Sequence, residues 1–202
     1  MNRAKSRLLD AVPFTMLCIG GSTAFYLFLW WVGTRINPVG GRGLGNIPIQ
    51  VLAAYGASFP EGVWEGGWQR FVLPMFMHAN LIHLAVNMYA LFQLGPAAEM
   101  HFGTSSFGSI YLLSGVGGIC LSLLLGGRLS VGASTSLFGI LGAYLAVRIM
   151  ACWDWRQAWK DKQVRRTAFW IAFNFALIGL AFPNVDNWGH FGGLLSGVLY
   201  GG

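Results

Sequence analysis

Long apolar runs, interrupted by glycine, proline and charged residues, occupy most of this 202-residue chain. A membrane-spanning helix needs about 20 mostly apolar residues. The spacing of the runs predicts six spanning helices, at residues 13–36, 78–98, 106–125, 132–148, 167–182 and from 189 onward. Because proline disrupts helices, Gly95-Pro96 is expected to close the second helix and Pro183-Asn184 to stop the fifth. The predicted fold class is therefore an all-α integral membrane protein, a six-helix bundle.

The sixth run is shorter than the others. Residues 189–202 would rise only about 21 Å at 1.5 Å per residue, which is less than the hydrocarbon core of about 30 Å. We therefore expect either a trimmed chain or a natural protein that continues beyond Gly202.

Composition agrees with a membrane protein and excludes other classes. Hydrophobic residues make up 55% of the chain and charged residues only 10%, against about 25% charged in soluble domains. This deficit excludes a soluble globular domain and a disordered chain. The net charge of +6 does not predict nucleic-acid binding, because the thirteen Lys and Arg residues are spread between apolar runs. The three cysteines form no metal-binding pattern, and no disulfide framework is expected.

The basic residues predict the orientation of the bundle. Nine of the thirteen lie before the first helix or between the fourth and fifth, namely Arg3, Lys5, Arg7, Arg148, Arg156, Lys160, Lys162, Arg165 and Arg166. By the positive-inside rule these segments face the cytoplasm. Residues 1–12 then form a short cytoplasmic tail, and residues 13–202 form one membrane domain with both termini cytoplasmic. Residues 37–70, rich in Gly, Pro and Trp, form a long, semi-ordered outer loop between helices one and two.

Polar side chains inside the predicted helices gather on one side of the membrane. Helices two, four and six all begin at the outer face, and near these starts lie His78, His83, Asn87, Ser134, Thr135, Ser136 and His190. Polar groups in spanning segments are costly and tend to be functional. The agreement in depth therefore predicts a site near the outer face, with Thr135 and Ser136 as packing or capping residues.

A serine and a histidine are the minimum for nucleophilic acyl transfer, because an imidazole must take the hydroxyl proton. Ser134 is expected in the first turn of its helix, where backbone N–H groups lack helical partners and can stabilise an oxyanion. His83 and Asn87 are four residues apart and share one helix face. The sequence has no HExxH motif and no close pair of carboxylates in the membrane portion, so neither metal nor aspartyl hydrolysis is predicted. No cofactor is expected.

For His190 to reach Ser134, the fourth and sixth helices must approach closely, which small residues permit in membranes. Such residues occur on both helices, at Gly132, Ser136, Gly139, Ala143, Gly189, Gly193 and Gly197. Asp186, four residues before His190, could orient the imidazole as a third triad member or could simply belong to the loop beside Asn187.

Several segments match one known pattern in order and spacing. Residues 78–87 fit HxxxxHxxxN, residues 132–134 fit GxS, and residues 186–193 resemble a segment that carries a catalytic histidine. Weaker matches are Trp68-Gln69-Arg70, Glu99 with Gly103, and residues 111–115. Together, over about residues 68–201, the chain resembles the rhomboid family of intramembrane serine proteases. Thr135 departs from the family pattern, where most members have Gly.

The resemblance implies a catalytic dyad of Ser134 and His190 and an oxyanion hole formed by His83, Asn87 and the Ser134 amide. It also implies that His78 and Gly132 are structural residues near the site. The implied partners are the lipid bilayer and single-pass membrane proteins, which are cut within or beside the membrane helix.

Other interpretations remain open. A non-catalytic rhomboid-like protein could bind or escort membrane helices, although inactive relatives generally lack the serine or the histidine and both are present here. Haem ligation by the histidines would need facing ligands deep in a bundle, and a transporter would need repeat symmetry. Because no transit-like segment follows Met1 beyond residues 3–7, a bacterial-type cytoplasmic membrane is expected, with the site opening to the outer face.

Overall fold

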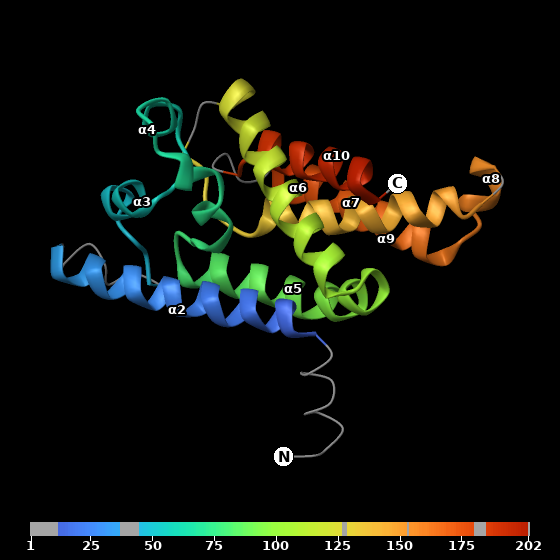
Figure 1. Ribbon diagram of the computed structural model, residues 1–202, viewed down its shortest axis with the longest axis horizontal. Helices are drawn as coiled ribbons and strands as arrows, with labels where there is room; N and C mark the ends of the chain where they lie inside the picture. Colours follow the sequence, from blue (N-terminus) through green and yellow to red (C-terminus); the bar gives the residue numbers. More distant parts are fainter. Residues whose placement is uncertain (1–11, 37–44, 127–128, 153, 180–184, 202) are drawn as a thin grey trace, which may run out of the picture.

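The computed structural model describes residues 12–36, 45–126, 129–152, 154–179 and 185–201. Its long elements there are all helices: α2 (Pro13–Ile36), α5 (Leu81–Phe102), α6 (Thr104–Leu125), α7 (Ser134–Met150), α9 (Lys162–Phe173) and α10 (Asn187–Gly201) (Figure 1). Shorter helices connect them: α3 (Ile49–Tyr55), α4 (Pro60–Trp64), η1 (Trp68–Phe71), η2 (Leu73–Phe76), α8 (Trp155–Ala158) and the π-helix η3 (Asn174–Gly179).

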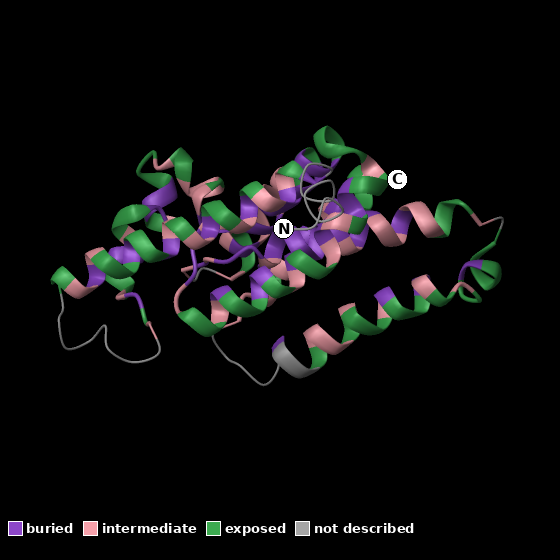
Figure 2. Ribbon diagram, turned by 90° about the horizontal axis from the view of Figure 1, so that it is seen from below, coloured by how far each residue is buried: buried purple, intermediate pink, exposed green. Residues whose placement is uncertain are grey.

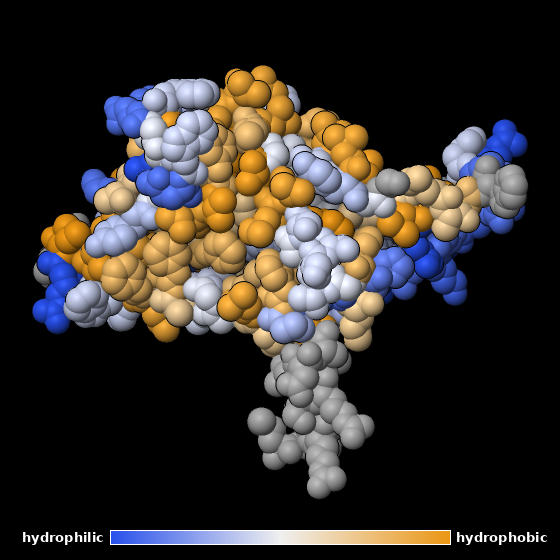
Figure 3. All heavy atoms as spheres, viewed as in Figure 1, coloured by the Kyte–Doolittle hydropathy of each residue, from blue (hydrophilic) through white to orange (hydrophobic). Residues whose placement is uncertain are grey.

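Within the described residues, three helices are long and apolar enough to cross a membrane: α2, α5 and α6, with 24, 22 and 22 residues. The apolar helix α7 is shorter, at 17 residues. Large hydrophobic side chains such as Leu17 and Trp31 on α2 are exposed, and apolar surface covers much of the face seen in Figure 3. The protein is therefore a multi-pass integral membrane protein, and the count of six crossings stays a prediction.

The helix bounds follow the sequence most closely where local signals are strong. α2 spans the residues expected of the first helix. α5 begins at Leu81, not at His78, because the side chain of Asn80 caps it by accepting a hydrogen bond from the His83 amide at 2.8 Å. α9 begins at Lys162, five residues before the expected start, after the cap residue Asp161. The expected end of the fifth helix at 182 lies outside the described residues.

The expectation that Gly95-Pro96 closes the second helix is wrong, because α5 continues through Pro96 to Phe102. The last turns of α5 place the buried carboxylate of Glu99 at the start of α2. This carboxylate accepts hydrogen bonds from the Phe14 amide (3.0 Å), the Thr15 amide (2.8 Å) and the Thr15 hydroxyl (2.7 Å). First-turn amides have no partners in their own helix and favour a negative group. Docking against α2 therefore stabilises the part of α5 that the proline rule would end.

The connection between α2 and α5 is helical over much of its described length. Residues 37–44 lie outside the described residues, and α3, α4, η1 and η2 follow. The guanidinium of Arg70 donates to the carbonyl oxygens of Ala53 (2.7 Å) and Ala57 (2.8 Å), and it lies 4.7 Å from the Phe59 ring centroid. Arg70 therefore ties η1 to the end of α3, which gives an internal framework to a loop expected to be only semi-ordered.

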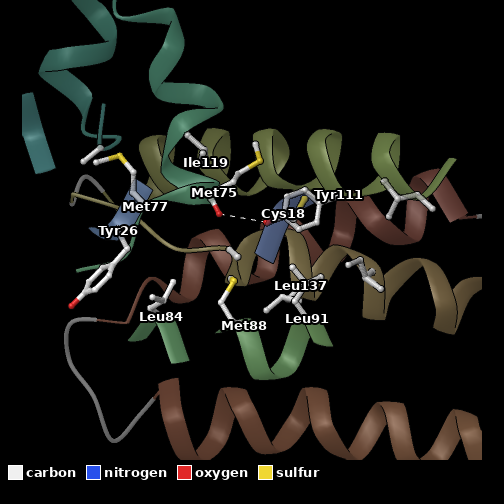
Figure 4. Packing of buried hydrophobic residues seen from close by; sticks show 14 of the residues in the cluster. Cys18, Tyr26, Met75, Met77, Leu84, Met88, Leu91, Tyr111, Ile119 and Leu137 are labelled. Atoms are coloured by element: carbon white, nitrogen blue, oxygen red, sulfur yellow. Dashed lines mark hydrogen bonds between the residues drawn. The ribbon is translucent and has the colours of Figure 1, made fainter. Parts of the chain in front are cut away.

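The core lies where α2, η2, α5, α6 and α7 meet (Figure 4). Its buried side chains include Cys18 from α2, Met75 from η2 and Leu91 from α5. The buried hydroxyl of Tyr111 on α6 donates to the Met75 carbonyl oxygen at 3.4 Å. η2 is therefore held inside the bundle, directly before the loop that carries His78.

Helix α10 packs tightly against both α7 and α6, and Figure 2 shows the buried residues concentrated among the packed helices. A Cβ atom added at Gly193 would collide with the main chain of Thr135 on α7, and one at Gly197 would collide with the main chain of Gly139. One at Gly192 would lie 2.9 Å from the Gly117 carbonyl oxygen on α6. The expected close approach of the fourth and sixth helices is thus present in the structure, and α6 takes part in it as well.

Candidate active site

Ser134 and His190 meet between α7 and α10. The Ser134 hydroxyl oxygen lies 2.7 Å from Nε2 of His190, which is a hydrogen-bonding distance. Ser134 is the first residue of α7, and His190 is in the first turn of α10. Both residues are partly buried. A hydroxyl in contact with an imidazole nitrogen is the arrangement that activates serine as a nucleophile.

The backbone before Ser134 is held by contacts with the connection between α2 and α5. Ser130 forms an antiparallel bridge with Ser58, and the Gly132 amide donates to the Pro74 carbonyl oxygen at 2.8 Å. Gly132 has a φ of 126°, a backbone conformation that residues other than glycine rarely adopt. A Cβ atom there would also lie 2.7 Å from Nε2 of His83. Gly132 therefore lets the chain turn into α7 while its backbone approaches the imidazole of His83.

The predicted oxyanion residues occupy one side of α5. The described contacts place the His83 ring against Gly132, next to Ser134. Asn87 lies one helical turn further along, is buried, and donates through Nδ2 to the His83 carbonyl oxygen at 2.9 Å. His78 is fully buried in the loop before α5, and its ring stacks edge-on against His83 with centroids 5.1 Å apart. His78 is therefore placed to support the ring of His83.

Sequence reasoning missed the aromatic support of His190. The ring of Phe138 stacks on the imidazole with centroids 4.6 Å apart and planes inclined by 23°. Phe175 from η3 lies against both rings, 5.0 Å from Phe138 and 6.3 Å from His190. Phe138 is four residues after Ser134 and so projects from nearly the same face of α7. That spacing was the available signal, but the stacking itself depends on where α10 lies.

Loss of the Phe138 ring should disturb the imidazole. We expect Phe138→Leu to slow the labelling of Ser134 by a serine-directed fluorophosphonate probe by up to about tenfold, since a stacked aromatic pair contributes about 0.5–1.5 kcal/mol. Phe138→Tyr retains a ring and serves as the matched control, with a labelling rate close to that of the parent. The labelling rates of both purified variants in detergent would check this. A Phe138→Leu variant labelled as fast as Phe138→Tyr would show that the stacking does not position His190.

Comparisons with known proteins show which family the chain belongs to. The family model for the rhomboid domain matches residues 65–202, which is more than half of the chain. The chain belongs to the rhomboid family. It is 34% identical over 162 residues to the rhomboid protease GluP of Bacillus subtilis, covering 77% of this chain and 30% of GluP.

Relatives from other organisms are also similar. The chain is 42% identical over 135 residues to RHOMBOID-like protein 6, mitochondrial, of Arabidopsis thaliana, covering 65% of this chain and 42% of that protein. It is 29% identical over 154 residues to Rhomboid-like protease 2 of Toxoplasma gondii, covering 75% of this chain and 53% of the relative. The chain thus spans about a third to a half of the length of these relatives.

In this member of the rhomboid family, Asp186 caps α10. One carboxylate oxygen accepts a hydrogen bond from the Gly189 amide at 2.8 Å, and the main-chain oxygen accepts one from the His190 amide at 3.0 Å. Among the described contacts, no hydrogen bond joins this carboxylate to the imidazole of His190. Asp186 therefore positions His190 through the start of the helix, and the geometry does not support it as a third triad member.

Thr135, which departs from the common rhomboid pattern, is accommodated by glycines on two other helices. Its side chain is buried against Gly118 of α6 and Gly189 of α10. A Cβ atom added at Gly118 would lie 2.9 Å from Thr135 Cβ, and one added at Gly189 would lie 3.1 Å from Thr135 Cγ2. The Ser136 side chain is likewise buried, against Gly115. Both residues pack between helices, as expected, and neither forms a described side-chain cap.

Within the ranges that the structure describes, no three His, Cys, Asp or Glu side chains are grouped closely enough to hold a metal ion.

Proposed function

We propose that this chain is an intramembrane serine endopeptidase that uses Ser134 as nucleophile and His190 as general base. The observation that carries the proposal is the 2.7 Å contact between the Ser134 hydroxyl and His190 Nε2. Family membership supports it, since two of the relatives described above are named as proteases. The presence of both residues argues against the alternative of a non-catalytic protein that binds or escorts membrane helices.

The proposed reaction proceeds through an acyl-enzyme. His190 removes the hydroxyl proton of Ser134 as the oxygen attacks the scissile carbonyl carbon. The resulting oxyanion is stabilised by the Ser134 amide together with His83 and Asn87. The protonated His190 then gives its proton to the leaving amine, and the peptide bond breaks. In the second half, His190 activates a water molecule that hydrolyses the ester and frees Ser134.

The proposed substrates are membrane proteins cut within or beside a spanning helix. A helix entering from the bilayer must unwind locally to present an extended backbone to Ser134. Small residues near the cut would assist, because glycine leaves helical geometry readily. The bilayer is thus both the medium of the protein and the route by which substrates arrive.

We also propose the topology that the charges predict. The bundle would cross the membrane six times, through α2, α5, α6, α7, α9 with η3, and α10. Residues 1–12 would form a cytoplasmic tail, residues 13–202 the protease domain and residues 37–70 an outer loop. In a bacterial-type cytoplasmic membrane, both termini would be cytoplasmic and the site would open to the outer face.

A fluorophosphonate probe tests the proposed nucleophile directly. Such probes react with activated serines, so the purified protein in detergent should be labelled and Ser134→Ala should not. The buried Ser136, two residues further along α7, offers the matched control, and Ser136→Ala should retain labelling. Labelling that survives Ser134→Ala would remove Ser134 from this role, and absence of labelling in the parent would favour the non-catalytic alternative.

Loss of one group from the proposed oxyanion hole should reduce turnover only in part. Asn87→Ala is expected to lower turnover by about 100–1,000-fold without abolishing it, because one oxyanion donor of several is lost. Fluorophosphonate labelling should persist more strongly than in Ser134→Ala, since the nucleophile and base remain. If the turnover of Asn87→Ala stays within a few-fold of the parent, the Asn87 side chain does not take part in the reaction. Its role would then be to stabilise α5, where its amide donates to the His83 carbonyl oxygen.

A further inference from the structure

The connection between α7 and α9 carries a concentration of positive charge that the proposed catalysis does not use. Five of the thirteen Lys and Arg residues fall within residues 156–166. All five are exposed: Arg156, Lys160, Lys162, Arg165 and Arg166. We call residues 154–166 the basic loop; it comprises α8 and the start of α9. Hydrophilic residues gather in Figure 3 at the end of the molecule where Figure 1 places α8.

The acidic residues of the basic loop are already engaged. The carboxylate of Asp154 accepts a hydrogen bond from the Gln157 amide at 2.7 Å. Asp161 accepts one from the Gln163 amide at 2.8 Å and forms an ion pair with Arg148 of α7, with N and O atoms 2.6 Å apart. The Gln163 amide first, and Arg148 with it, hold the pKa of Asp161 below its ordinary value, so this carboxylate stays ionised and paired. Its charge is therefore matched by Arg148.

The five basic side chains consequently keep their charge available. In the part of the chain that the structure describes, none of them lies within ion-pair distance of a carboxylate. Arg165 folds back and donates to the carbonyl oxygens of Trp159 (3.2 Å) and Lys160 (3.0 Å), which closes the turn without neutralising the guanidinium. The basic loop is thus an ordered, exposed surface with a net positive charge.

Two tryptophans lie in the same loop. The side chains of Trp155 and Trp159 are 72% and 56% exposed, and the Arg156 guanidinium lies 5.4 Å from the Trp155 ring centroid. Ala158 and Val164 are buried and hold the loop against the protein. Indole rings favour the headgroup level of a bilayer, and Lys and Arg near the bilayer surface attract anionic lipids. Both kinds of group lie at one end of α7 and α9, where these helices would leave the membrane.

We propose that the basic loop binds the headgroups of anionic phospholipids, with Arg156, Lys160 and Lys162 contacting phosphate oxygens and the two indole rings seated among the headgroups. Charge complementarity supports an anionic partner, and the exposed indole rings favour a bilayer over a soluble acidic protein. The bound lipid would anchor the start of α9. Because η3 continues α9 and its Phe175 contacts His190, the anchor would also steady the helix that supports the imidazole.

Lipid association can be measured without any assay of proteolysis. The full chain is reconstituted into vesicles with spin-labelled phosphatidylglycerol or phosphatidylcholine, and electron paramagnetic resonance gives the fraction of each lipid bound at the protein. We expect a clear excess of the anionic lipid. A triple variant with Arg156→Gln, Lys160→Gln and Lys162→Gln should lower that excess by at least about fivefold, which is the effect of one basic residue at an anionic bilayer.

Two matched variants control for net charge and for folding. Arg156→Lys with Lys160→Arg and Lys162→Arg retains every charge and should keep the excess. Arg3→Gln with Lys5→Gln and Arg7→Gln removes the same charge elsewhere and should also keep most of it. Equal binding of both lipids by the parent, an unchanged excess in the first triple variant, or an equal loss in the N-terminal triple would each overturn the proposal.

A second measurement needs no variant, in case the triple substitution prevents folding. A photoactivatable phosphatidylglycerol is cross-linked to the parent protein in vesicles, and the modified peptides are mapped by mass spectrometry. Cross-links should fall within residues 154–166 and should decrease when unlabelled anionic lipid is added. Cross-links confined to other segments would overturn the proposal, whatever the outcome of the protease tests.

Discussion

Replacing either Ser134 or His190 with alanine is expected to lower cleavage of a membrane substrate by at least about 10,000-fold, and replacing both should lower it no further. The Ser134 hydroxyl oxygen and Nε2 of His190 lie 2.7 Å apart and form one proposed catalytic unit. Residues that act as a unit show non-additive effects when they are replaced. Without the imidazole the hydroxyl remains protonated, and without the hydroxyl the imidazole has no nucleophile to activate. Turnover of a single-pass substrate by the two purified single variants and by the double variant measures these losses.

The control for this series is a serine in a similar setting. Ser136 is buried in the same first turns of α7 and packs against Gly115, so Ser136→Ala should retain turnover within a few-fold of the parent. Two results would contradict the proposed dyad. One is appreciable turnover by Ser134→Ala, and the other is a double variant far less active than either single variant, which would mean that the two residues act in separate steps.

Gly193→Ala should both destabilise the protein and remove most of its activity. The added Cβ would collide with the main chain of Thr135, and main-chain atoms, unlike a flexible side chain, cannot rotate away. Overpacking of this kind costs about 1–3 kcal/mol. Because Thr135 directly follows Ser134, separating α10 from α7 also moves the nucleophile from His190, and a displacement of about 1 Å can cost about 100-fold in rate. Thermal unfolding in detergent and turnover measure the two effects.

Gly20→Ala is the matched control for the same chemical change. Gly20 lies on the exposed face of α2, and a Cβ atom there meets nothing within 4 Å. Removing a helical glycine there should leave activity unchanged and should raise stability slightly, by about 0.5–1 kcal/mol. If Gly193→Ala behaves like Gly20→Ala in both measurements, the contact between α7 and α10 is looser than the structure shows and does not position the dyad.

The sequence predicted most where a signal is local or repeats along one helix. The run from Pro13 to Ile36 contains its own evidence for a helix, and the structure has that helix. The glycines of α10 predicted a close approach to α7 because their spacing places them on one face. The prediction that the second helix ends at Pro96 was wrong because a contact between distant parts of the chain overrides the local effect of proline. Glu99 caps α2 through the amides of Phe14 and Thr15, which precede it by 85 and 84 positions in the sequence.

The catalytic proposal shows the same division. Ser134, His190, His83 and Asn87 could be selected from the sequence because polar residues in apolar helices are conspicuous. Phe138 could not, since an aromatic residue in an apolar helix is ordinary and its role depends on the imidazole that α10 brings to it. Asp186 was ambiguous for a related reason, because capping and triad roles require the same residue type and differ only in the contact made.

By itself, the sequence determined that this protein lies in the membrane, which polar groups it retains inside apolar helices, and that it resembles the rhomboid family. These conclusions depend on composition, period and motif order, which are properties of the chain. Only the tertiary structure decided that the Ser134 hydroxyl and the His190 imidazole touch, that Phe138 stacks on that imidazole, and that Glu99 carries α5 past Pro96. Each of these is a distance between helices, and such distances are set by the packing of many side chains at once.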